Sequence, residues 1–468
     1  MITETQNVKN TSIAENTKNY NEVVEYLNQR NRIDYNKNVI PRMKKLDKLC
    51  GNISKKIDLI VVGGANGKSL TMHFASKLLE EEGFKVGSCH SSNILNYNEQ
   101  ISVNFNTISN KEFTEFANKV INIVEQNNLE ATAFEILIET SLLYFESKQI
   151  KIALLEVGVG GQYDAANFGN PIISAVTRIA HDHNEILGES LDDITSHMLE
   201  IARPNNWFIS AEQSKLRLQK MKVWIKNERK AKWAMPIRKL ASLPYIFEQL
   251  FGRTASLGER IAQIYIEDIK GKFSPFLKGN LLATKKGQRG RPTLEAKRQS
   301  ELNPIKTLKT FWLDRFDLLK GRFELLEKEK PSILLDSAHN VDSFANLFLG
   351  IRLLHYQRPL KGLALILSLD DSIDYVETLK QIRYLVKKVP GQILFVPPKN
   401  KESKNIAVAI EKAKEMNIKA KSFNSLTQAF EAAKTIAHER DGLICISGSN
   451  KIITQYWKNI RGIKVLSA

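Results

Sequence analysis

Residues 59–69 read Leu-Ile-Val-Val-Gly-Gly-Ala-Asn-Gly-Lys-Ser, and they predict the first strand and turn of an α/β domain. Four apolar residues in succession, entered through Ile57 and Asp58, are typical of a strand buried on both faces. The glycines allow a tight turn, and residues 70–82 then show the apolar spacing of a helix that ends at Gly83. A strand, a glycine-rich turn and a helix in this order form a cradle for phosphate, because backbone N–H groups and the helix N-terminus converge on an anion.

The side chains of this turn support the same prediction. Lys68 supplies a positive charge for a phosphate, and Ser69 supplies a hydroxyl for Mg²⁺. The spacing departs from the full G-x-x-x-x-G-K-[ST] pattern, because Gly63 lies four residues before Gly67 rather than five. The alternative interpretation is a plain strand–helix turn that contains a lysine.

Further strands and turns follow along the chain. Residues 151–156 are an apolar run that leads into a glycine-rich turn. Residues 172–177 are another, and it leads into His181-Asp-His183. Such runs alternating with helical stretches indicate a parallel sheet covered on both faces. Glu156 closes its strand at the carboxyl end, where ligands bind in such sheets, so it is either a Mg²⁺ ligand or a capping carboxylate. His183 follows its strand in the same way, and a structural role is equally open for it.

A second series of apolar runs begins near residue 331 and continues for about 135 residues, which predicts a smaller, Rossmann-like α/β domain. The expected strands are 332–336, 362–368, 392–396 and 442–447, and the expected helices are 403–416 and 426–440. Before this second series, residues 20–50 and residues 250–270 also carry helical patterns.

The composition excludes several classes of protein. Of the 468 residues, 43% are apolar and 25% are charged, so a wholly disordered or collagen-like chain is excluded. No apolar run approaches the roughly 18 residues of a membrane span, and no secretory signal pattern is present, so we expect no membrane association. Cys50, Cys89 and Cys445 are far apart, which favours the reducing cytoplasm.

The net charge of +17 is concentrated in one part of the chain. Residues 203–330 hold 29 Lys and Arg against 13 Asp and Glu, which gives this segment a charge of +16. Such an excess suits an anionic partner, such as a nucleotide or a nucleic acid, or it is a lysine-rich solvated surface.

Eight short motifs occur in one order along the chain. They are Gly64-Ala-Asn-Gly-Lys68, Ser91 with Glu99-Gln-Ile101, Phe134-Glu135, Leu155-Glu-Val-Gly-Val-Gly-Gly161 with Asp164 and Asn167, Thr177 to His183 with Leu187-Gly188, Gly321-Arg322, Asp336-Ser-Ala-His-Asn340 and Gly448-Ser449. In this order they resemble the folylpolyglutamate synthase/dihydrofolate synthase family, within the Mur-ligase superfamily. The resemblance spans about residues 20–450 and is weak only in 205–320.

The resemblance implies a ligase of two α/β domains with ATP between them. Residues 19–325 would form a P-loop-containing, Mur-ligase-like ATPase domain with a parallel sheet and a divergent basic segment at 205–320. Residues 326–468 would form the smaller Rossmann-like domain. Residues 1–18 are polar, and their composition predicts a disordered tail. The resemblance also implies a cytoplasmic monomer that acts on small molecules, a pteroate or folate and L-glutamate.

In the family, ATP phosphorylates a substrate carboxylate, and the amine of glutamate attacks the acyl phosphate to form an amide. Lys68 and Mg²⁺ would neutralise the charge that leaves the γ-phosphate. The residues implied to bind the nucleotide are Gly64, Asn66, Gly67, Lys68, Ser69, Arg322, Asp336 and His339. Those implied to hold Mg²⁺ are Ser69, Glu156 and His183, and those implied to act in catalysis are Lys68, Glu156 and His183. Phe134-Glu135 matches a pair near the substrate and the metal.

The chain also departs from the family pattern. Met198 stands where the family has a lysine that is carbamylated to hold a second Mg²⁺, and methionine cannot form a carbamate. Either this metal is lost, or His197 or Glu200 substitutes for the lysine, or the enzyme is slow. The family's Asp-Lys-Asp is reduced to Asp370-Asp-Ser372, which affects the expectation for substrate binding.

Two alternative functions stay open. Ser69 directly after Lys68 is closer to the Mur branch, which favours another Mur-type amino-acid ligase. Arg289-Gly-Arg-Pro292, within the basic stretch 285–298, resembles the core of an AT-hook, which inserts arginine into a narrow minor groove. This pattern is typical either of a nucleic-acid-binding segment on a decayed ligase fold or of a plain basic loop.

Overall fold

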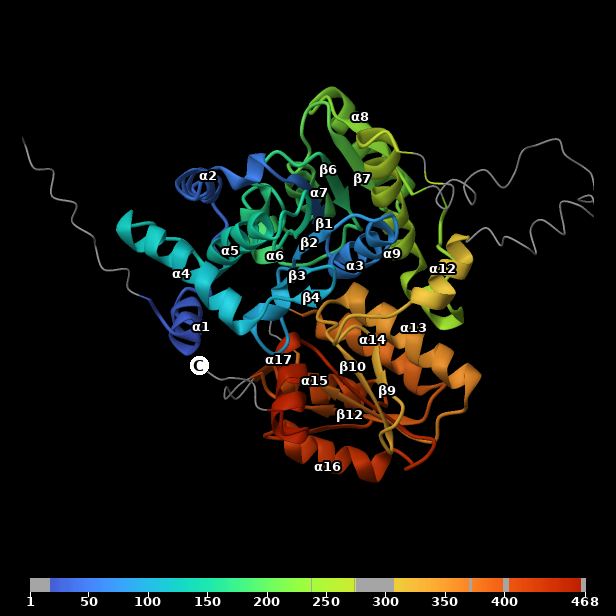
Figure 1. Ribbon diagram of the computed structural model, residues 1–468. Helices are drawn as coiled ribbons and strands as arrows, with labels where there is room; N and C mark the ends of the chain where they lie inside the picture. Colours follow the sequence, from blue (N-terminus) through green and yellow to red (C-terminus); the bar gives the residue numbers. More distant parts are fainter. Residues whose placement is uncertain are drawn as a thin grey trace, which may run out of the picture.

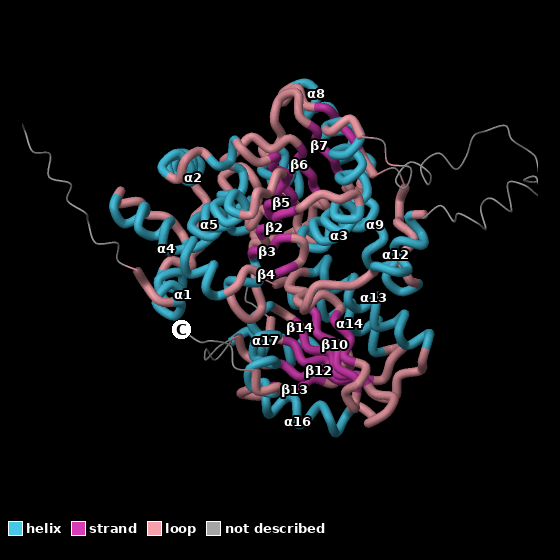
Figure 2. Tube along the Cα trace, in the orientation of Figure 1, coloured by secondary structure: helices cyan, strands magenta, loops and turns pink. Residues whose placement is uncertain are grey.

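Two β-sheets formed by different parts of the chain organise the fold (Figures 1 and 2). The computed structural model describes residues 17–236, 238–272, 274, 307–369, 373–398 and 404–463. Three expected features lie outside these residues: positions 1–16 of the tail, the basic stretch 285–298 and Asp370-Asp-Ser372.

Within the described residues, the first sheet has eight strands in the order β4-β3-β2-β5-β1-β6-β7-β8. Their bounds are β1 Asp58–Gly63, β2 Val86–Cys89, β3 Ile101–Val103, β4 Asn106–Thr107, β5 Ile152–Glu156, β6 Ile173–Val176, β7 Trp207–Ser210 and β8 Lys232–Ala234. The strands expected from the apolar runs are confirmed. The expectation of a wholly parallel sheet is wrong at one edge, because β3 and β4 form an antiparallel hairpin beside β2.

Helices cover both faces of this sheet (Figure 1). Side chains alternate along β1, so that Ile60 and Val62 pack in one core with α3 and α9, while Leu59 and Val61 pack in the other with α4 and α5. The helices are α1 Tyr20–Gln29, α2 Val39–Leu49, α3 Lys68–Glu81, α4 Asn110–Gln126, α5 Ala133–Ser147, α6 Asn184–Leu187, α7 Leu191–Leu199, α8 Lys215–Asn227, α9 Tyr245–Gln263 and α12 Leu308–Arg315. A π-helical turn, Ile264–Ile269, continues α9.

The helical stretch expected at 20–50 is two helices rather than one. Residues 30–38, which include three asparagines, interrupt it, because asparagine side chains compete with the helix for backbone hydrogen bonds. Among the helices that the structure describes, none has the length and apolarity that a membrane crossing requires.

The second sheet has the strand order β13-β12-β11-β14-β10-β9, six strands in the part of the chain that is described. The strands are β9 Glu324–Leu326, β10 Ser332–Asp336, β11 Leu363–Leu367, β12 Gly391–Phe395, β13 Ala420–Ser422 and β14 Leu443–Ser447. The helices are α13 Val341–Gln357, α14 Tyr375–Val386, α15 Lys404–Glu415, α16 Leu426–Ile436 and α17 Asn450–Gln455. The expected strands are confirmed. Because β9 pairs with β10, a boundary between 325 and 326 would pass through a strand, and its position stays a prediction.

The two domains share an apolar contact. Helix α9 lies along α3 of the first domain and also packs on α13 of the second. At Gly350 of α13 an added Cβ would lie 2.2 Å from Phe323 Cε2 and 3.0 Å from Leu250 Cδ1, so the helices approach closely there. One hydrophobic cluster therefore runs without a break from Ile60 of β1 to Leu334 of β10.

One ionisable side chain lies inside the first domain. Glu139 of α5 has no exposed surface, and its neighbours include Asp47 and the Cys50 thiol. Neither of its carboxylate oxygens has a hydrogen-bond partner of good geometry among the described residues. Burial, followed by the negative charge of Asp47, raises the pKa of Glu139 to about 8, so this carboxyl is largely protonated at neutral pH.

Candidate active site

The turn after β1 has a conformation that only glycine adopts readily. Gly64 has φ +121° and Gly67 has φ +87°, both in the left-handed region. At Gly64 an added Cβ would also lie 2.1 Å from Thr177 Oγ1. Lys68 begins α3, and its Nζ donates to the Gly64 carbonyl at 3.0 Å. The turn is therefore a backbone-lined cradle with one cation folded across it, which is the arrangement that binds phosphate.

Ser69 and Glu156 meet at the carboxyl edge of the sheet. Ser69 Oγ donates to Glu156 Oε1 at 3.0 Å, and His90 Nδ1 lies 3.0 Å from Glu156 Oε2. Neighbouring parallel strands bring them together, because Glu156 ends β5 and His90 follows β2. Burial would raise the pKa of Glu156, but the hydrogen bond and charge of His90, with the charges of Lys68 and Arg322, lower it to about 2. Glu156 is therefore a buried anion.

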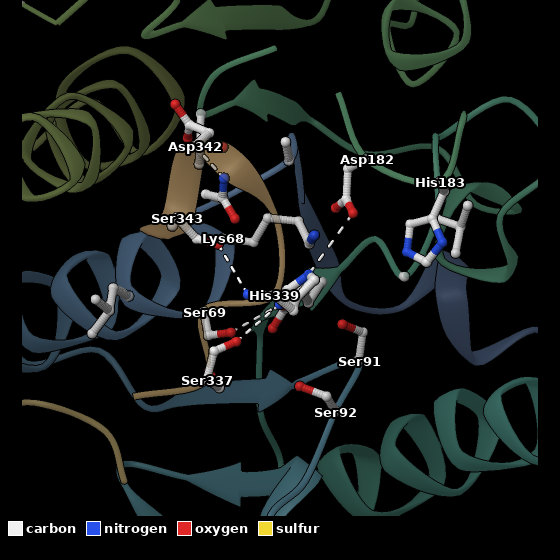
Figure 3. A pocket seen from close by; sticks show the side chains of 18 of the residues that line it. Lys68, Ser69, Ser91, Ser92, Asp182, His183, Ser337, His339, Asp342 and Ser343 are labelled. Atoms are coloured by element: carbon white, nitrogen blue, oxygen red, sulfur yellow. Dashed lines mark hydrogen bonds and ion pairs between the residues drawn. The ribbon is translucent and has the colours of Figure 1, made fainter. Parts of the chain in front are cut away.

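His183 lies away from that pair. It follows β6 in a left-handed conformation (φ +52°), and its Nδ1 lies 3.6 Å from Glu185 Oε1. Figure 3 shows it set apart from Ser69, with Asp182 between His183 and the second-domain residues. Asp182 faces the second domain, with Oδ1 3.8 Å from His339 Nε2. His183 lines the same cavity, but its role as a Mg²⁺ ligand stays a prediction.

The second domain contributes the loop after β10. Asp336 accepts hydrogen bonds from the backbone N–H of Phe323 and of Ala338, both at 2.8 Å. Burial raises the pKa of Asp336, against these hydrogen bonds and the charge of Arg322, which lower it. Asp336 therefore joins the segment that carries Arg322 to the segment that carries His339.

Side chains from both domains meet beside the phosphate cradle. Asn66 Nδ2 donates to Asp342 Oδ2 at 2.8 Å and to Asn340 Oδ1 at 3.0 Å. Arg178, which follows β6, reaches the other oxygen of Asp342 at 2.7 Å. Asn340 also caps α13 by accepting from the backbone N–H of Ser343. These contacts hold the N-terminus of α13 over the cradle (Figure 3).

The predicted site residues gather around one cavity of about 820 Å³. Those that line it are Asn66, Gly67, Lys68, Ser69, Glu156, His183, Arg322, Asp336 and His339. Gly64 lies in the same turn, where it accepts from Lys68. Two buried hydroxyl oxygens of the lining, Thr177 Oγ1 and Ser337 Oγ, have no hydrogen-bond partner in the described part of the chain. Unpartnered polar groups in a cavity of this size indicate a polar ligand.

The other end of the cavity lies between residues 30–38 and the start of α5. Tyr35 and Phe134 line it with aromatic rings. Asp164 lines it with a buried carboxyl that accepts from three backbone N–H groups. Burial, against these hydrogen bonds, raises the pKa of Asp164 to about 6. This end therefore combines flat apolar surface with one polar anchor.

Glu135 belongs to the Phe134-Glu135 motif, which the family resemblance places near the substrate and the metal. In the structure its carboxylate is bound by other residues of the protein. Its two carboxylate oxygens accept from Arg42 at 2.7 and 2.9 Å, and it also accepts from the backbone N–H of Thr132 at 2.7 Å. Arg42 in turn contacts Asp34. Glu135 therefore fixes the start of α5 against the residues after α1, and its oxygens are occupied.

Ser69 and Glu156 are suitable ligands for Mg²⁺, which proteins usually hold through one or two side chains together with water and substrate phosphates. Within the described ranges, no group of three or more His, Cys, Asp and Glu residues is arranged to hold a metal ion. The residues present thus fit a Mg²⁺ ion whose remaining ligands are water and the oxygens of a bound phosphate.

Helix α7, which contains Met198, contributes no further side chain that could bind a metal in the cavity. Met198 is buried, with Sδ 3.8 Å from where a Cβ on Gly63 would lie. His197 Nδ1 lies 3.0 Å from the Tyr35 hydroxyl, and Glu200 pairs with Arg229. None of Met198, His197 and Glu200 is in the lining of the cavity.

Sequence reasoning missed His90, Arg178, Asp342 and Arg253, all of which lie at the cavity or contact its lining. Arg178 lies inside the motif Thr177 to His183, and Asp342 follows Asp336-Ser-Ala-His-Asn340 by two residues. Their proximity to these motifs could have identified them as site residues. His90 follows a strand of four residues, and Arg253 lies within the divergent segment, so neither carried a local signal.

The amino-acid sequence and the fold are both similar to those of enzymes with closely related names. The chain is 30% identical over 316 residues to a dihydrofolate synthase/folylpolyglutamate synthase of Bacillus subtilis, which covers 65% of this chain and 70% of that protein. Its fold is similar to that of a Mycobacterium tuberculosis folylpolyglutamate synthase complexed with ADP (TM-score 0.73, 17% identity, 95% of this chain and 98% of that one). It is also similar to E. coli FolC in complex with DHPP and ADP (TM-score 0.68, 19% identity, 95% and 98%). No family model matches the chain.

Proposed function

The chain belongs to the dihydrofolate synthase/folylpolyglutamate synthase family, and we propose that it is an ATP-dependent ligase that joins L-glutamate to a carboxylate of a pteroate or folate. The observation that carries the proposal is that one and the same cavity joins a phosphate cradle to an aromatic pocket. Both ends are needed, because the γ-phosphate and the acceptor carboxylate must meet for phosphoryl transfer.

At the phosphate end, the chain supplies charges of both signs. Lys68 and Arg322 would bind phosphate oxygens and neutralise the charge that develops on them during transfer. Ser69 and Glu156 would hold Mg²⁺, which supplies further neutralisation of phosphate charge. Because Glu156 is an anion across the physiological pH range, it needs no proton release before it can act as a ligand.

At the aromatic end, the chain supplies a site for a planar ring. We propose that the pterin ring of the substrate lies between Phe134 and the residues 30–38, and that Asp164 contacts its polar edge. The acid end of the substrate would then point toward Lys68. The carboxylate attacks the γ-phosphorus of ATP, ADP leaves, and an acyl phosphate forms. The amine of glutamate then attacks the acyl carbon, inorganic phosphate leaves with the amine losing a proton, and an amide forms.

We further propose that the enzyme works without the second, carbamate-held Mg²⁺ of the family. The reason is that Met198 cannot form a carbamate, and His197 and Glu200 are bound to Tyr35 and Arg229. The described cysteines are free thiols, and a monomer acting in the reducing cytoplasm fits them.

The test is ADP release by the purified protein with Mg-ATP and glutamate, with dihydropteroate or tetrahydrofolate added in turn. We expect release to need glutamate and one pterin acid, and to fall by at least about 100-fold in Lys68→Ala, because a phosphate-binding cation is lost. Lys85→Ala is the matched control, since Lys85 is exposed and outside the cavity lining. Equal ADP release without either acceptor substrate would refute the proposal. Release that needs a UDP-sugar peptide instead would favour a Mur-type ligase.

A further inference from the structure

Arg253 of α9 is a half-buried cation that lines the cavity. No hydrogen bond or ion pair joins its guanidinium to another residue in the ranges that the structure describes. A guanidinium carries five N–H donors in a fixed plane, and withdrawing it from water without an acceptor is unfavourable. An arginine in this state, facing a ligand-sized cavity, is suited to an anion that arrives with the ligand.

The packing of α9 places Arg253 at the phosphate end of the cavity. The next residue, Thr254, has its Oγ1 3.2 Å from where a Cβ on Gly67 would lie, so α9 touches the phosphate cradle at this point. One turn further on, an added Cβ at Gly258 would lie 2.9 Å from the backbone nitrogen of Ala75 in α3. This close packing fixes α9 against the helix that begins at Lys68.

The neighbouring charged groups do not neutralise Arg253. Arg178 lies close enough to lower its pKa, second to the effect of burial, and its own charge is paired with Asp342. Glu212 acts in the opposite direction, but its carboxylate already accepts from Arg217 and from the backbone N–H groups of residues 179, 213 and 214. Arg178 is therefore already paired and the carboxylate of Glu212 is already occupied, so neither neighbour supplies a bound counter-charge for Arg253.

We infer that Arg253 binds the phosphate chain of the nucleotide, as a third cation beside Lys68 and Arg322. The inference rests on the proposed function, since it takes the nucleotide to occupy the cradle. Arg322 and the residues after β10 lie on the second-domain side of the cavity, whereas Arg253 belongs to the first domain, as Lys68 does. Arg253 would therefore contact phosphate whether or not the second domain is in place, and its effect should be seen already in the binding of ADP alone.

The test is calorimetric titration of the whole chain with Mg-ADP and with adenosine. The variants are Arg253→Gln and Arg253→Lys, and the matched control is Arg260→Gln. Arg260 lies on the same helix outside the cavity lining, where its Nη1 donates to Gln263. Removing a charge-assisted hydrogen bond to phosphate should raise the ADP Kd by about 10- to 100-fold in Arg253→Gln. Adenosine affinity should stay unchanged, Arg253→Lys should lie between the two, and the control should match the parent protein.

Two results would overturn the inference. One is an ADP Kd in Arg253→Gln within twofold of the parent, with far-UV circular dichroism showing both proteins folded. The other is a loss of adenosine affinity equal to the loss of ADP affinity, which would place the guanidinium at the nucleoside instead. A parent protein that binds no ADP would refute the proposed function itself, so the two failures are distinguishable. In steady-state assays we expect the KM for ATP to rise more than kcat falls.

Discussion

Replacing Glu139 with glutamine should remove a large part of the pH dependence of stability. The carboxyl has a pKa of about 8 in the folded protein against 4.5 for an exposed glutamate. Below pH 4.5 it is protonated in both states, and its contribution to stability is fully present. As the pH rises from 4.5 to 8, the unfolded chain ionises freely while the folded chain does not, so the free energy of unfolding falls; above pH 8 it changes no further on this account.

The size of the effect follows from the same shift. One pH unit within this window corresponds to about 1.4 kcal/mol, so the free energy of unfolding should fall by about 3 kcal/mol between pH 5 and pH 7 through this residue. The glutamine variant keeps the shape of the side chain and cannot ionise. Its stability relative to the parent should therefore rise by about that amount over the same interval.

The assay is urea unfolding of parent and variant at pH 5, 6, 7 and 8, followed by far-UV circular dichroism. The difference between the two proteins cancels the groups that titrate in both. Glu130→Gln, at an exposed position, is the control and should parallel the parent at every pH. Parallel curves for Glu139→Gln and the parent would refute the reasoning, because they would mean that Glu139 does not change its protonation on folding.

Three further substitutions test the site. Gly64→Ala places a Cβ 2.1 Å from Thr177 Oγ1 and should raise the ADP Kd at least tenfold by calorimetry, whereas Gly83→Ala, also at a positive φ (+83°) but with no atom within 4 Å, should leave it unchanged; equal effects would mean that backbone strain alone is responsible. Asp342→Asn removes the ion pair with Arg178 and should increase the radius of gyration of the ligand-free protein in small-angle X-ray scattering, and an unchanged radius would show that this pair does not hold the domains. Tyr35→Phe removes the hydrogen bond to His197 and should raise the KM for the pterin acid by about fivefold while leaving the KM for ATP unchanged; a change in the KM for ATP alone would contradict the placement of Tyr35 at the substrate end.

The parts of the fold that could be predicted are those with continuous apolar strands. β1, β5, β6 and the long strands of the second sheet are buried on both faces, so most of their residues are apolar and the polar ones lie mainly at the strand ends. Strands such as β2, with the sequence Val-Gly-Ser-Cys, and β8, with three residues, are too short and too mixed to stand out. Their positions depend on the pairing partner and not on their own composition.

The same limit applies to the site. That Glu156 would lie beside Ser69 follows from the rule that parallel strands end at one edge of a sheet, and the structure places them in contact. Which histidine would lie beside Glu156 could not be deduced, since His183 and His90 both follow strands of this sheet. The strand order decides between them, because β2 pairs with β5 whereas β6 is separated from β5 by β1. Arg253 depends on the packing of α9 against α3, between segments nearly 200 positions apart, and no spacing in the sequence encodes that.

The apolar contact of α9 with α13 has a consequence for any attempt to study the halves separately. A fragment that ends before Gly321 would carry Leu250 with its partner surface removed, and a fragment that begins at Gly321 would expose Phe323 and the face of α13 around Gly350. Each would present to solvent a patch that the intact chain encloses, and such patches promote association. The visible waist of the molecule in Figure 1 is thus a poor place for proteolytic dissection or for gene truncation, and isolated halves should be recovered as aggregates or not at all.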